Sequence, residues 1–266
     1  MTQLDQISIY PIKSCSGINL QSSQVLDRGF PHDRRWLLID QEGQFISQRS
    51  TPLLGQIKIS MNSSQLNVSY IGKSTLSVNF NNQSNVRHKA LIWKDKVDGL
   101  WVGRESDDWF SHVLGQQVHL IHMNDKVHRP LIKDRLPQDR SFEVSFADGY
   151  PYLLTSQSSL DDLNSRLGNP VPMDRFRANL IVSGFDAFAE DGWKRIRIGE
   201  VEFMVVKPCA RCQVTTIDQE TGASSKEPLK TLATYRKQDG KVMFGMNLVA
   251  LSAGSVNLKD PVTIIA

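Results

Sequence analysis

Two cysteines with an arginine between them stand out in the stretch VVKPCARCQVTTID, residues 205–218. β-Branched residues precede Cys209 and Cys212, and residues 213–218 resume a strand-like pattern, so we expect a tight turn between two strands. Such a turn brings both thiols close to Arg211. A neighbouring cation favours the thiolate, which is the form that binds a metal ion or attacks an electrophile. The planar guanidinium also suits a phosphate group, because it can donate to two oxygens at once.

Structural zinc and thiol–disulfide exchange are two other interpretations of the cysteine pair. Zinc needs four ligands, and the spacing of His119 and His122 would allow a Cys2His2 set. However, these histidines flank Leu120 and Ile121 in a strand-like run, where their side chains would point to opposite faces. A thioredoxin-like pair begins a helix after a strand, whereas strand-like sequence follows Cys212. Both interpretations are therefore weak.

The composition limits the class of protein. With 266 residues the chain can form one or two domains with a substantial core. Its net charge is +3 and it has no long Lys/Arg run, so we expect no nucleic-acid partner. No segment approaches the ~20 apolar residues of a membrane span. The start of the chain does not resemble a secretory signal, and three cysteines suggest free thiols, so we expect a cytoplasmic protein without membrane contact.

Short strands separated by turn residues dominate the rest of the chain. The main predicted strands are 4–12, 18–26, 36–39, 45–48, 57–61, 65–70, 75–80, 86–92, 98–102, 118–122, 152–155, 180–182, 193–198, 201–206, 213–218, 244–248 and 262–265. This spacing is typical of a β-barrel or sandwich. Helices are predicted at 107–114 after Ser106, at 159–167 after Ser156 or Ser158, and at 229–237 after Pro228. The Asn/Ser-rich piece 79–85 and the basic stretch 124–138 are predicted to be loops.

Several polar residues lie where they can face a ligand. Lys13 and Ser14 follow the first predicted strand in a turn that can hold an anion, although the residues alone favour an ordinary polar turn. Arg34 precedes an apolar strand, so it either pairs with an acid or faces a ligand. Arg177 and Asn179 are two residues apart, and in a strand they would share one side. Core hydrogen bonding and ligand contact are both compatible with this pair.

These motifs occur in an order that resembles one known family. They are YPIKSCSG (10–17), DRRW (33–36), FRANLIVSG (176–184), KPCARCQVTTID (207–218), KEPLKTLATYR (226–236), FGMN (244–247) and KDPV (259–262). Together they resemble the molybdenum cofactor sulfurase C-terminal (MOSC) proteins, especially the class of the mitochondrial amidoxime-reducing component and its bacterial iron–sulfur relatives. The resemblance implies a mainly β fold with a few helices, in which a smaller N-terminal β-barrel subdomain precedes the MOSC β-barrel. We expect an N-terminal domain at 1–122 and a MOSC domain at 123–266.

The resemblance also implies a cofactor, molybdopterin-bound molybdenum, and a set of residues that hold it. The protein ligand of the metal matches Cys212, and Cys209 matches a cysteine with a structural or auxiliary role. The other matching positions, on the phosphate side or along the pterin, are Lys13, Ser14, Arg34, Asp148, Arg177, Asn179, Arg211 and Asn247. At Gly149 and Ala210 only main-chain contacts could carry over.

The activity implied by the resemblance is molybdenum-dependent reduction of N-hydroxylated compounds, such as hydroxylamines, amidoximes or hydroxylated bases, with Cys212 as the catalytic ligand. Some bacterial relatives append a ferredoxin-like domain with a [2Fe–2S] cluster. Such a cluster needs four protein ligands, and this chain has three cysteines without a ferredoxin spacing. We therefore expect no iron–sulfur cluster in this chain and a separate electron-donor protein of the ferredoxin or flavin type.

A sulfur carrier or cofactor-delivery protein is the alternative function, with a persulfide on Cys212. The sulfurase relatives join such a domain to a pyridoxal-phosphate desulfurase. No such domain is evident here, and Lys13 alone does not make a Schiff-base site, so pyridoxal phosphate is not expected. A domain that has kept the fold without the cofactor is the third alternative.

Overall fold

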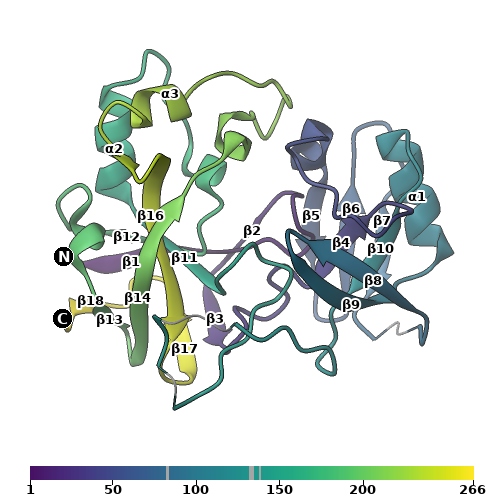
Figure 1. The fold of residues 1–266 in the computed structure, drawn as a ribbon, viewed down its shortest axis with the longest axis horizontal. Coiled ribbons are helices and arrows are strands. Elements are labelled where there is room, and N and C mark those ends of the chain that lie inside the picture. The colour runs from purple at the N-terminus through teal and green to yellow at the C-terminus, as the bar shows by residue number, and fades with distance from the viewer. Residues whose placement is uncertain (82–83, 132–134, 138) are drawn as a thin grey trace.

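The computed structural model describes residues 1–81, 84–131, 135–137 and 139–266. Figure 1 shows two β-rich halves side by side, with both chain termini in the same half. The mainly β fold with a few helices is therefore confirmed. The predicted loops 79–85 and 124–138 lie in part outside the described residues.

The larger half is built on a nine-stranded sheet, with the order β18-β13-β14-β16-β11-β12-β1-β2 and β15 paired to β16. The chain's first strands belong to this sheet, because β1 pairs with β12 and β2 pairs with β1. Only β11 and β12 run parallel to each other among the pairs described in this sheet. The bounds are β1 Gln3–Ile9, β2 Ile18–Leu20, β11 Tyr152–Ser156, β12 Leu180–Ser183, β13 Arg195–Ile198, β14 Val201–Ala210, β15 Lys237–Gln238, β16 Lys241–Ala250 and β18 Val262–Ile264. A separate ribbon joins β3 Ser22–Val25 to β17 Gly254–Asn257.

The smaller half contains a four-stranded sheet, β4-β10-β9-β8, and a three-stranded sheet, β5-β6-β7. The bounds are β4 Trp36–Ile39, β5 Lys58–Met61, β6 Gln65–Ser69, β7 Leu76–Asn79, β8 Arg87–Ile92, β9 Asp95–Trp101 and β10 His119–His122. Side chains alternate between buried and partly exposed along β6, as expected for a strand that covers a core on one face. The predicted return strand 45–48 is wrong, since only an isolated bridge joins Phe45 to Ile39.

Three α-helices and four 3-10 turns complete the described fold. They are α1 Arg104–Leu114, α2 Gln157–Ser165, α3 Leu229–Leu232, η1 Pro52–Gln56, η2 Met173–Phe176, η3 Ala189–Gly192 and η4 Gln213–Thr216. Helix α1 starts three residues earlier than predicted, with Gly103 rather than Ser106 at its N-cap. The Ser156 cap of α2 is confirmed, because its side chain accepts the Ser159 N–H. Helix α3 is much shorter than the predicted 229–237.

The strand carrying Cys209 is longer than its sequence pattern suggested. β14 continues past Pro208 to Ala210, and its pairing with β16 shifts register on both sides of that proline. Proline has no N–H to give to a ladder, so a register shift is where a strand can accommodate it. The predicted strand 213–218 is wrong, because η4 begins there instead. Thr215 and Thr216 each donate a hydroxyl hydrogen bond to the carbonyl three residues earlier, which favours a tight turn over an extended chain.

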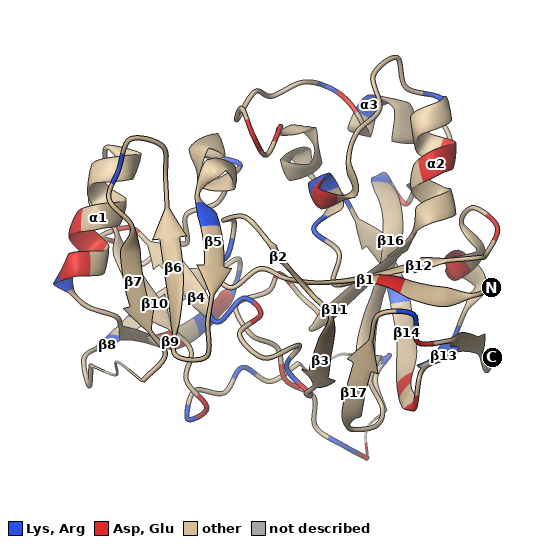
Figure 2. Ribbon diagram, turned by 180° about the vertical axis from the view of Figure 1, so that it is seen from behind, with Lys and Arg blue, Asp and Glu red and all other residues tan. Residues whose placement is uncertain are grey.

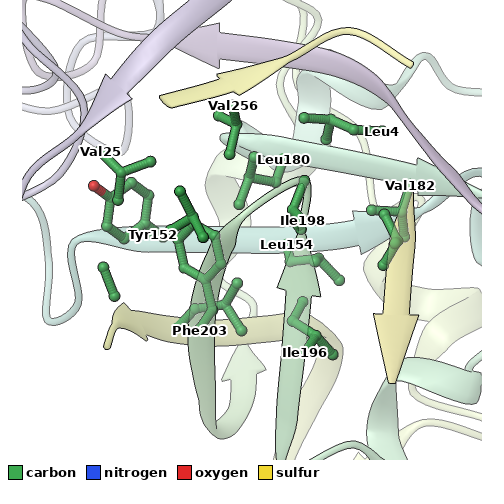
Figure 3. Close-up of a cluster of buried hydrophobic side chains, with 14 of the residues drawn as sticks. Leu4, Val25, Tyr152, Leu154, Leu180, Val182, Ile196, Ile198, Phe203 and Val256 are labelled. Carbon is green, nitrogen blue, oxygen red and sulfur yellow. The ribbon is translucent and has the colours of Figure 1, made fainter. Parts of the chain in front are cut away.

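The core of the larger half is a continuous apolar cluster, and Figure 3 shows its side chains converging from several strands. Leu154, Leu180 and Phe203 are fully buried in it. Tyr152 packs edge-on against Phe203, with ring centroids 5.4 Å apart. Its hydroxyl lies at the border of the cluster, where it donates to the Leu26 carbonyl at 2.6 Å and accepts the Leu26 N–H at 3.0 Å. One side chain therefore ties β11 to the segment after β3.

None of the helices in the described ranges has the length and hydrophobicity that a bilayer span requires.

We predict that Tyr152→Phe lowers the free energy of unfolding by about 1–2 kcal/mol, because it leaves the half-buried Leu26 N–H without its partner and removes one of the two donors to the Leu26 carbonyl, which also accepts the Gly29 N–H at 3.2 Å. Chemical denaturation followed by circular dichroism measures the change. Tyr70→Phe is the control, since that hydroxyl makes no hydrogen bond to a described residue and its loss should cost little. Equal effects of the two substitutions would contradict the prediction.

Candidate functional site

A hollow lies where the two halves meet, and the nine residues predicted for the site all line it. They are Lys13, Ser14, Arg34, Asp148, Arg177, Asn179, Arg211, Cys212 and Asn247. The structure therefore brings together residues separated by more than 230 positions in the chain. Figure 2 shows Lys and Arg segments on the loops between the halves.

Three cysteines are free, and two of them face this hollow. Burial raises the pKa of the Cys15 thiol to about 12, so this residue stays protonated and belongs to the core. Cys209 and Cys212 are half-buried. Cys209 lies at the end of β14, and Cys212 sits at the N-terminus of η4. The strand end and the tight turn thus hold both thiols at the edge of the hollow.

The place of Arg211 between the two cysteines suggested that it contacts both thiols. Among the described contacts, the only thiol that its side chain meets is that of Cys209. Its Nη1 donates to Cys209 Sγ at 3.0 Å, and its Nη2 donates to the Phe176 carbonyl at 2.7 Å. Its Nε is buried and has no hydrogen-bond partner among the residues that the structure describes. A buried polar atom that lacks a partner is costly, so this nitrogen suits a ligand atom.

The cation beside Cys212 is Arg49, which the sequence analysis missed. Arg49 Nη2 lies 3.5 Å from Cys212 Sγ, and the guanidinium lies over the Trp93 indole at 4.3 Å. Asp148 Oδ2 is 3.9 Å from the same guanidinium nitrogen. The contact joins residues 163 positions apart, and no local pattern around Arg49 signals it.

Arg34 and Arg177 lie against the same aromatic ring. Their guanidinium carbons are 4.4 Å and 4.2 Å from the centroid of Tyr10. Arg34 also pairs with Asp33 at 2.7 Å and donates to Asn179 Oδ1 at 3.0 Å. Burial lowers the pKa of the Arg177 guanidinium to about 10, which still leaves it cationic at neutral pH. The result is a pair of like charges held side by side at the hollow.

Lys13 and Asp148 form the ion pair at the other side of the hollow. Lys13 Nζ donates to Asp148 Oδ1 at 2.6 Å and to the Phe146 carbonyl at 2.8 Å. Burial lowers the pKa of the Lys13 ammonium, and Asp148 offsets part of that effect. Desolvation raises the pKa of Asp148, but the charges of Lys13 and Arg49 outweigh it and hold that pKa well below its usual range.

Three residues of the site have left-handed backbone conformations that side chains other than glycine rarely adopt. The φ angles are 73° at Ser14, 49° at Arg34 and 53° at Arg177. Arg177 therefore ends η2 and does not share a strand face with Asn179, so the predicted strand geometry is wrong. Non-glycine residues in this region cluster at binding and active sites. Each strained residue is one that the resemblance marked as cofactor-binding.

The two asparagines of the site make core or main-chain hydrogen bonds. Asn179 is buried and donates to the Ser8 carbonyl at 3.0 Å and to Asp33 Oδ2 at 3.2 Å. Asn247 Nδ2 donates to the Pro208 carbonyl at 3.3 Å, next to the register shift of β14. Both residues therefore fix the walls of the hollow, whatever they contact in addition.

Two family models match the chain: the MOSC N-terminal beta barrel domain over residues 1–117 and the MOSC domain over residues 141–263. The chain is 33% identical to human mitochondrial amidoxime-reducing component 1 over 279 aligned residues, which cover 98% of this chain and 82% of that protein. This chain belongs to the MOSC family. Rat mitochondrial amidoxime reducing component 2 is also 33% identical, over 97% of this chain and 82% of its own length. The molybdenum cofactor sulfurase of Oryza sativa subsp. japonica is 32% identical over 92% of this chain, but only 32% of the sulfurase is matched.

The zinc interpretation finds no support in this MOSC protein. His119 Nδ1 contacts Asp107, while the His122 ring stacks on Trp36 with centroids 4.5 Å apart. The two histidines thus point to different faces, as predicted. Within the described ranges, no group of three or more His, Cys, Asp or Glu side chains is placed to hold a metal ion. A metal bound here would have to bring most of its ligands with it.

We predict that Asp148→Asn lowers the stability of this MOSC protein at pH 7 by about 1 kcal/mol, the discounted value of a partly exposed ion pair. The carboxylate has a lowered folded-state pKa, so its contribution is full above the unfolded value of about 4 and is lost as the pH falls further. The difference between wild type and variant should therefore shrink below about pH 4. Urea denaturation across a pH series measures it.

Asp27→Asn is the matched control for Asp148→Asn. Asp27 has the same side-chain exposure, 59%, but its partner Arg140 is 34% exposed whereas Lys13 is 9% exposed. We expect a smaller effect at Asp27. A difference in the free energy of unfolding between wild type and Asp148→Asn that stays constant from pH 7 to pH 2 would show that the charge of Asp148 contributes nothing to stability.

Proposed function

We propose that this MOSC protein is a molybdenum-cofactor-dependent reductase of N-hydroxylated compounds. The observation that supports it is the hollow itself, in which a half-buried cysteine faces five cationic side chains and one carboxylate. The cations are Lys13, Arg34, Arg49, Arg177 and Arg211. Relatives named for amidoxime reduction, similar over nearly the whole chain, support the choice of reaction.

The residues present fit the cofactor on chemical grounds. An excess of five cations over the single carboxylate that lines the hollow suits a phosphate-bearing ligand, and the Nε of Arg211, without a partner among the described residues, suits an acceptor atom on it. Cys212 would be the protein ligand of molybdenum, because a soft thiolate suits a polarisable metal. Cys209 accepts a hydrogen bond from Arg211, and we assign it an auxiliary role.

The cofactor-binding roles are those that the family resemblance implies, and all of these residues line the hollow. Lys13 and Ser14 would hold the phosphate side, together with Arg34. Asp148, Arg177, Asn179, Arg211 and Asn247 would line the pterin. The left-handed backbone conformations of Ser14, Arg34 and Arg177 would hold these residues in position before the cofactor binds. Binding would then cost little conformational entropy. We also propose that the chain divides in sequence into an N-terminal domain, 1–122, and a MOSC domain, 123–266, with β1 and β3 of the first paired to β12 and β17 of the second.

When bound, the molybdenum cofactor supplies a centre that passes two electrons to the substrate. The N–O bond of the N-hydroxylated compound breaks, two electrons and two protons are taken up, and the amine or amidine leaves together with water. The electrons come from a separate protein of the ferredoxin or flavin type. Arg49 lies beside Cys212 and can donate a hydrogen bond to a substrate oxygen there.

We predict stoichiometric molybdenum in protein purified from cells that make the cofactor, and its loss in Cys212→Ala. Elemental analysis measures the metal, and reduction of an amidoxime with an added reductant measures activity. Both should fall by at least about tenfold in Cys212→Ala, since the ligand atom is removed. Cys209→Ala is the control, and it should keep most of both.

Three results would contradict the proposed function or a part of it. Molybdenum that is present in wild type and fully retained in Cys212→Ala would refute Cys212 as the ligand. A cyanide-labile sulfur on Cys212 without molybdenum would instead favour a sulfur carrier. Loaded wild-type protein that reduces no N-hydroxylated compound would refute the reaction while leaving the cofactor assignment intact.

A further inference from the structure

The outer face of the β8–β9 hairpin carries an excess of positive charge. Lys89 lies on β8 and Lys96 on β9, and the register pairs Lys96 with Leu91, two residues after Lys89, so both lysines share that face. Lys94 lies in the turn of the hairpin, and Lys126 follows β10 and lines the same surface groove as Lys89 and Lys96. All four lysines are exposed, and we call them the lysine face.

The carboxylates around the lysine face are already paired with other cations. The pairs are Asp98 with Arg87, Asp95 with Arg129, Asp125 with Arg35 and Glu143 with Arg28. The four lysines themselves form no ion pair with a described residue. Since the whole chain has a net charge of only +3, this surplus is local, and it gives one side of the molecule a positive potential.

The tip of the same hairpin borders the hollow. Trp93, in the turn next to Lys94, donates its indole N–H to Asp148 Oδ1 at 3.2 Å, and its ring centroid lies 4.3 Å from the guanidinium carbon of Arg49. Both Asp148 and Arg49 line the hollow, and Arg49 Nη2 is 3.5 Å from Cys212 Sγ. A molecule that docks on the lysine face and reaches Trp93 is therefore separated from Cys212 by two side chains, those of Trp93 and Arg49.

Trp93 gives this surface an apolar centre. The residue is 50% exposed, and Phe45 packs edge-on against its ring with centroids 5.3 Å apart, so a fixed indole meets solvent. An exposed aromatic side chain with charged residues around it is typical of a protein–protein interface. Attraction between charges raises the association rate without a large buried area, so such a complex also separates quickly. A partner that delivers one electron per encounter needs this rapid binding and release.

We propose that the lysine face is the docking surface for an acidic, ferredoxin-type electron-carrier protein. The inference rests on the proposed function, because it names the partner that supplies electrons to that site and the place where the partner binds. Carboxylates of the carrier meet the four lysines, and its redox centre lies over Trp93. Each carrier gives up one electron, so two reduced carriers are oxidised for each N–O bond that breaks, and the two protons come from solvent.

Charge reversal of the lysine face tests this docking. The probe is a reduced plant-type [2Fe–2S] ferredoxin, which is strongly acidic, with an amidoxime as the electron acceptor. At low ionic strength, Lys89→Glu/Lys96→Glu/Lys126→Glu should lower kcat/KM for ferredoxin at least about tenfold, because attraction becomes repulsion. The loss should shrink as salt is added, since salt screens exposed charges. With saturating dithionite as the reductant, this variant should stay within about twofold of wild type.

A second triple variant with the same change in net charge is the matched control. Lys58→Glu/Lys73→Glu/Lys230→Glu reverses three exposed lysines that also lack an ion pair with a described residue and that line neither the hollow nor the groove. It should lower kcat/KM for ferredoxin by less than about threefold. Equal losses in the two triple variants would overturn the inference, because net charge and not this surface would then govern the encounter.

Binding without turnover gives a readout that does not depend on the reaction. Calorimetric titration of oxidised ferredoxin into wild type at low salt should show a complex, and its dissociation constant should rise at least about tenfold in the lysine-face variant and little in the control. The absence of a complex with wild type, or equal affinity in wild type and the lysine-face variant, would overturn the inference even if dithionite supports reduction.

Two other outcomes separate the docking surface from the proposed function and from a membrane. A ferredoxin complex that depends on these lysines, with no reduction of an N-hydroxylated compound by either reductant, would refute the proposed function and leave the docking surface in place. Lysine-dependent binding to vesicles of phosphatidylserine and phosphatidylcholine, with no ferredoxin complex, would overturn the inference and assign the surface to an anionic membrane.

Discussion

Two guanidinium groups held against one tyrosine ring are the constraint on which the site depends. The guanidinium carbons of Arg34 and Arg177 lie 4.4 and 4.2 Å from the centroid of Tyr10, and among the described residues only Arg34 has a carboxylate, Asp33, in contact. Like charges this close repel each other, so the surrounding fold must hold them. Tyr10 follows β1, while the arginines precede β4 and β12, so the stack also joins the segments that connect the two halves. An anionic ligand would relieve the repulsion, which makes the hollow a receptor for negative charge.

The two cysteines are contacted by different arginines, and this explains how both halves of the molecule contribute to the site. Arg211 lies beside the cysteines in sequence but partners Cys209, whereas the cation at Cys212 is Arg49 from the smaller half. The second thiol therefore acquires its partner only when the halves are packed together. Buried amides reinforce this packing, because Gln48 and Gln219 donate to each other at 2.8 and 3.0 Å across the same junction. The site is thus a property of the interface rather than of either half.

The sequence predicted the β-rich fold and nine of the residues that line the hollow, but not the full geometry of the hollow. Alternating and apolar runs identify most strands, because burial on one face leaves a period of two. The strand predicted at 213–218 was wrong because Thr hydroxyls there donate hydrogen bonds to nearby carbonyls. These bonds favour a 3-10 turn and compete with the β preference of the residues. The argument that placed Arg177 and Asn179 on one strand face failed for a similar reason: Arg177 has a left-handed backbone that alternation cannot reveal. Arg49 was missed because the partners of its side chain lie more than 40 residues later in the chain, and no local pattern encodes such a contact.

The most direct test of the central claim is to locate the metal in crystals of cofactor-loaded protein by anomalous diffraction at the molybdenum absorption edge. We predict one strong anomalous peak next to the sulfur of Cys212, inside the hollow, with the cofactor's phosphate among Lys13, Arg34 and Arg177. A peak bound elsewhere on the molecule, or a phosphate that avoids these cations, would contradict the account.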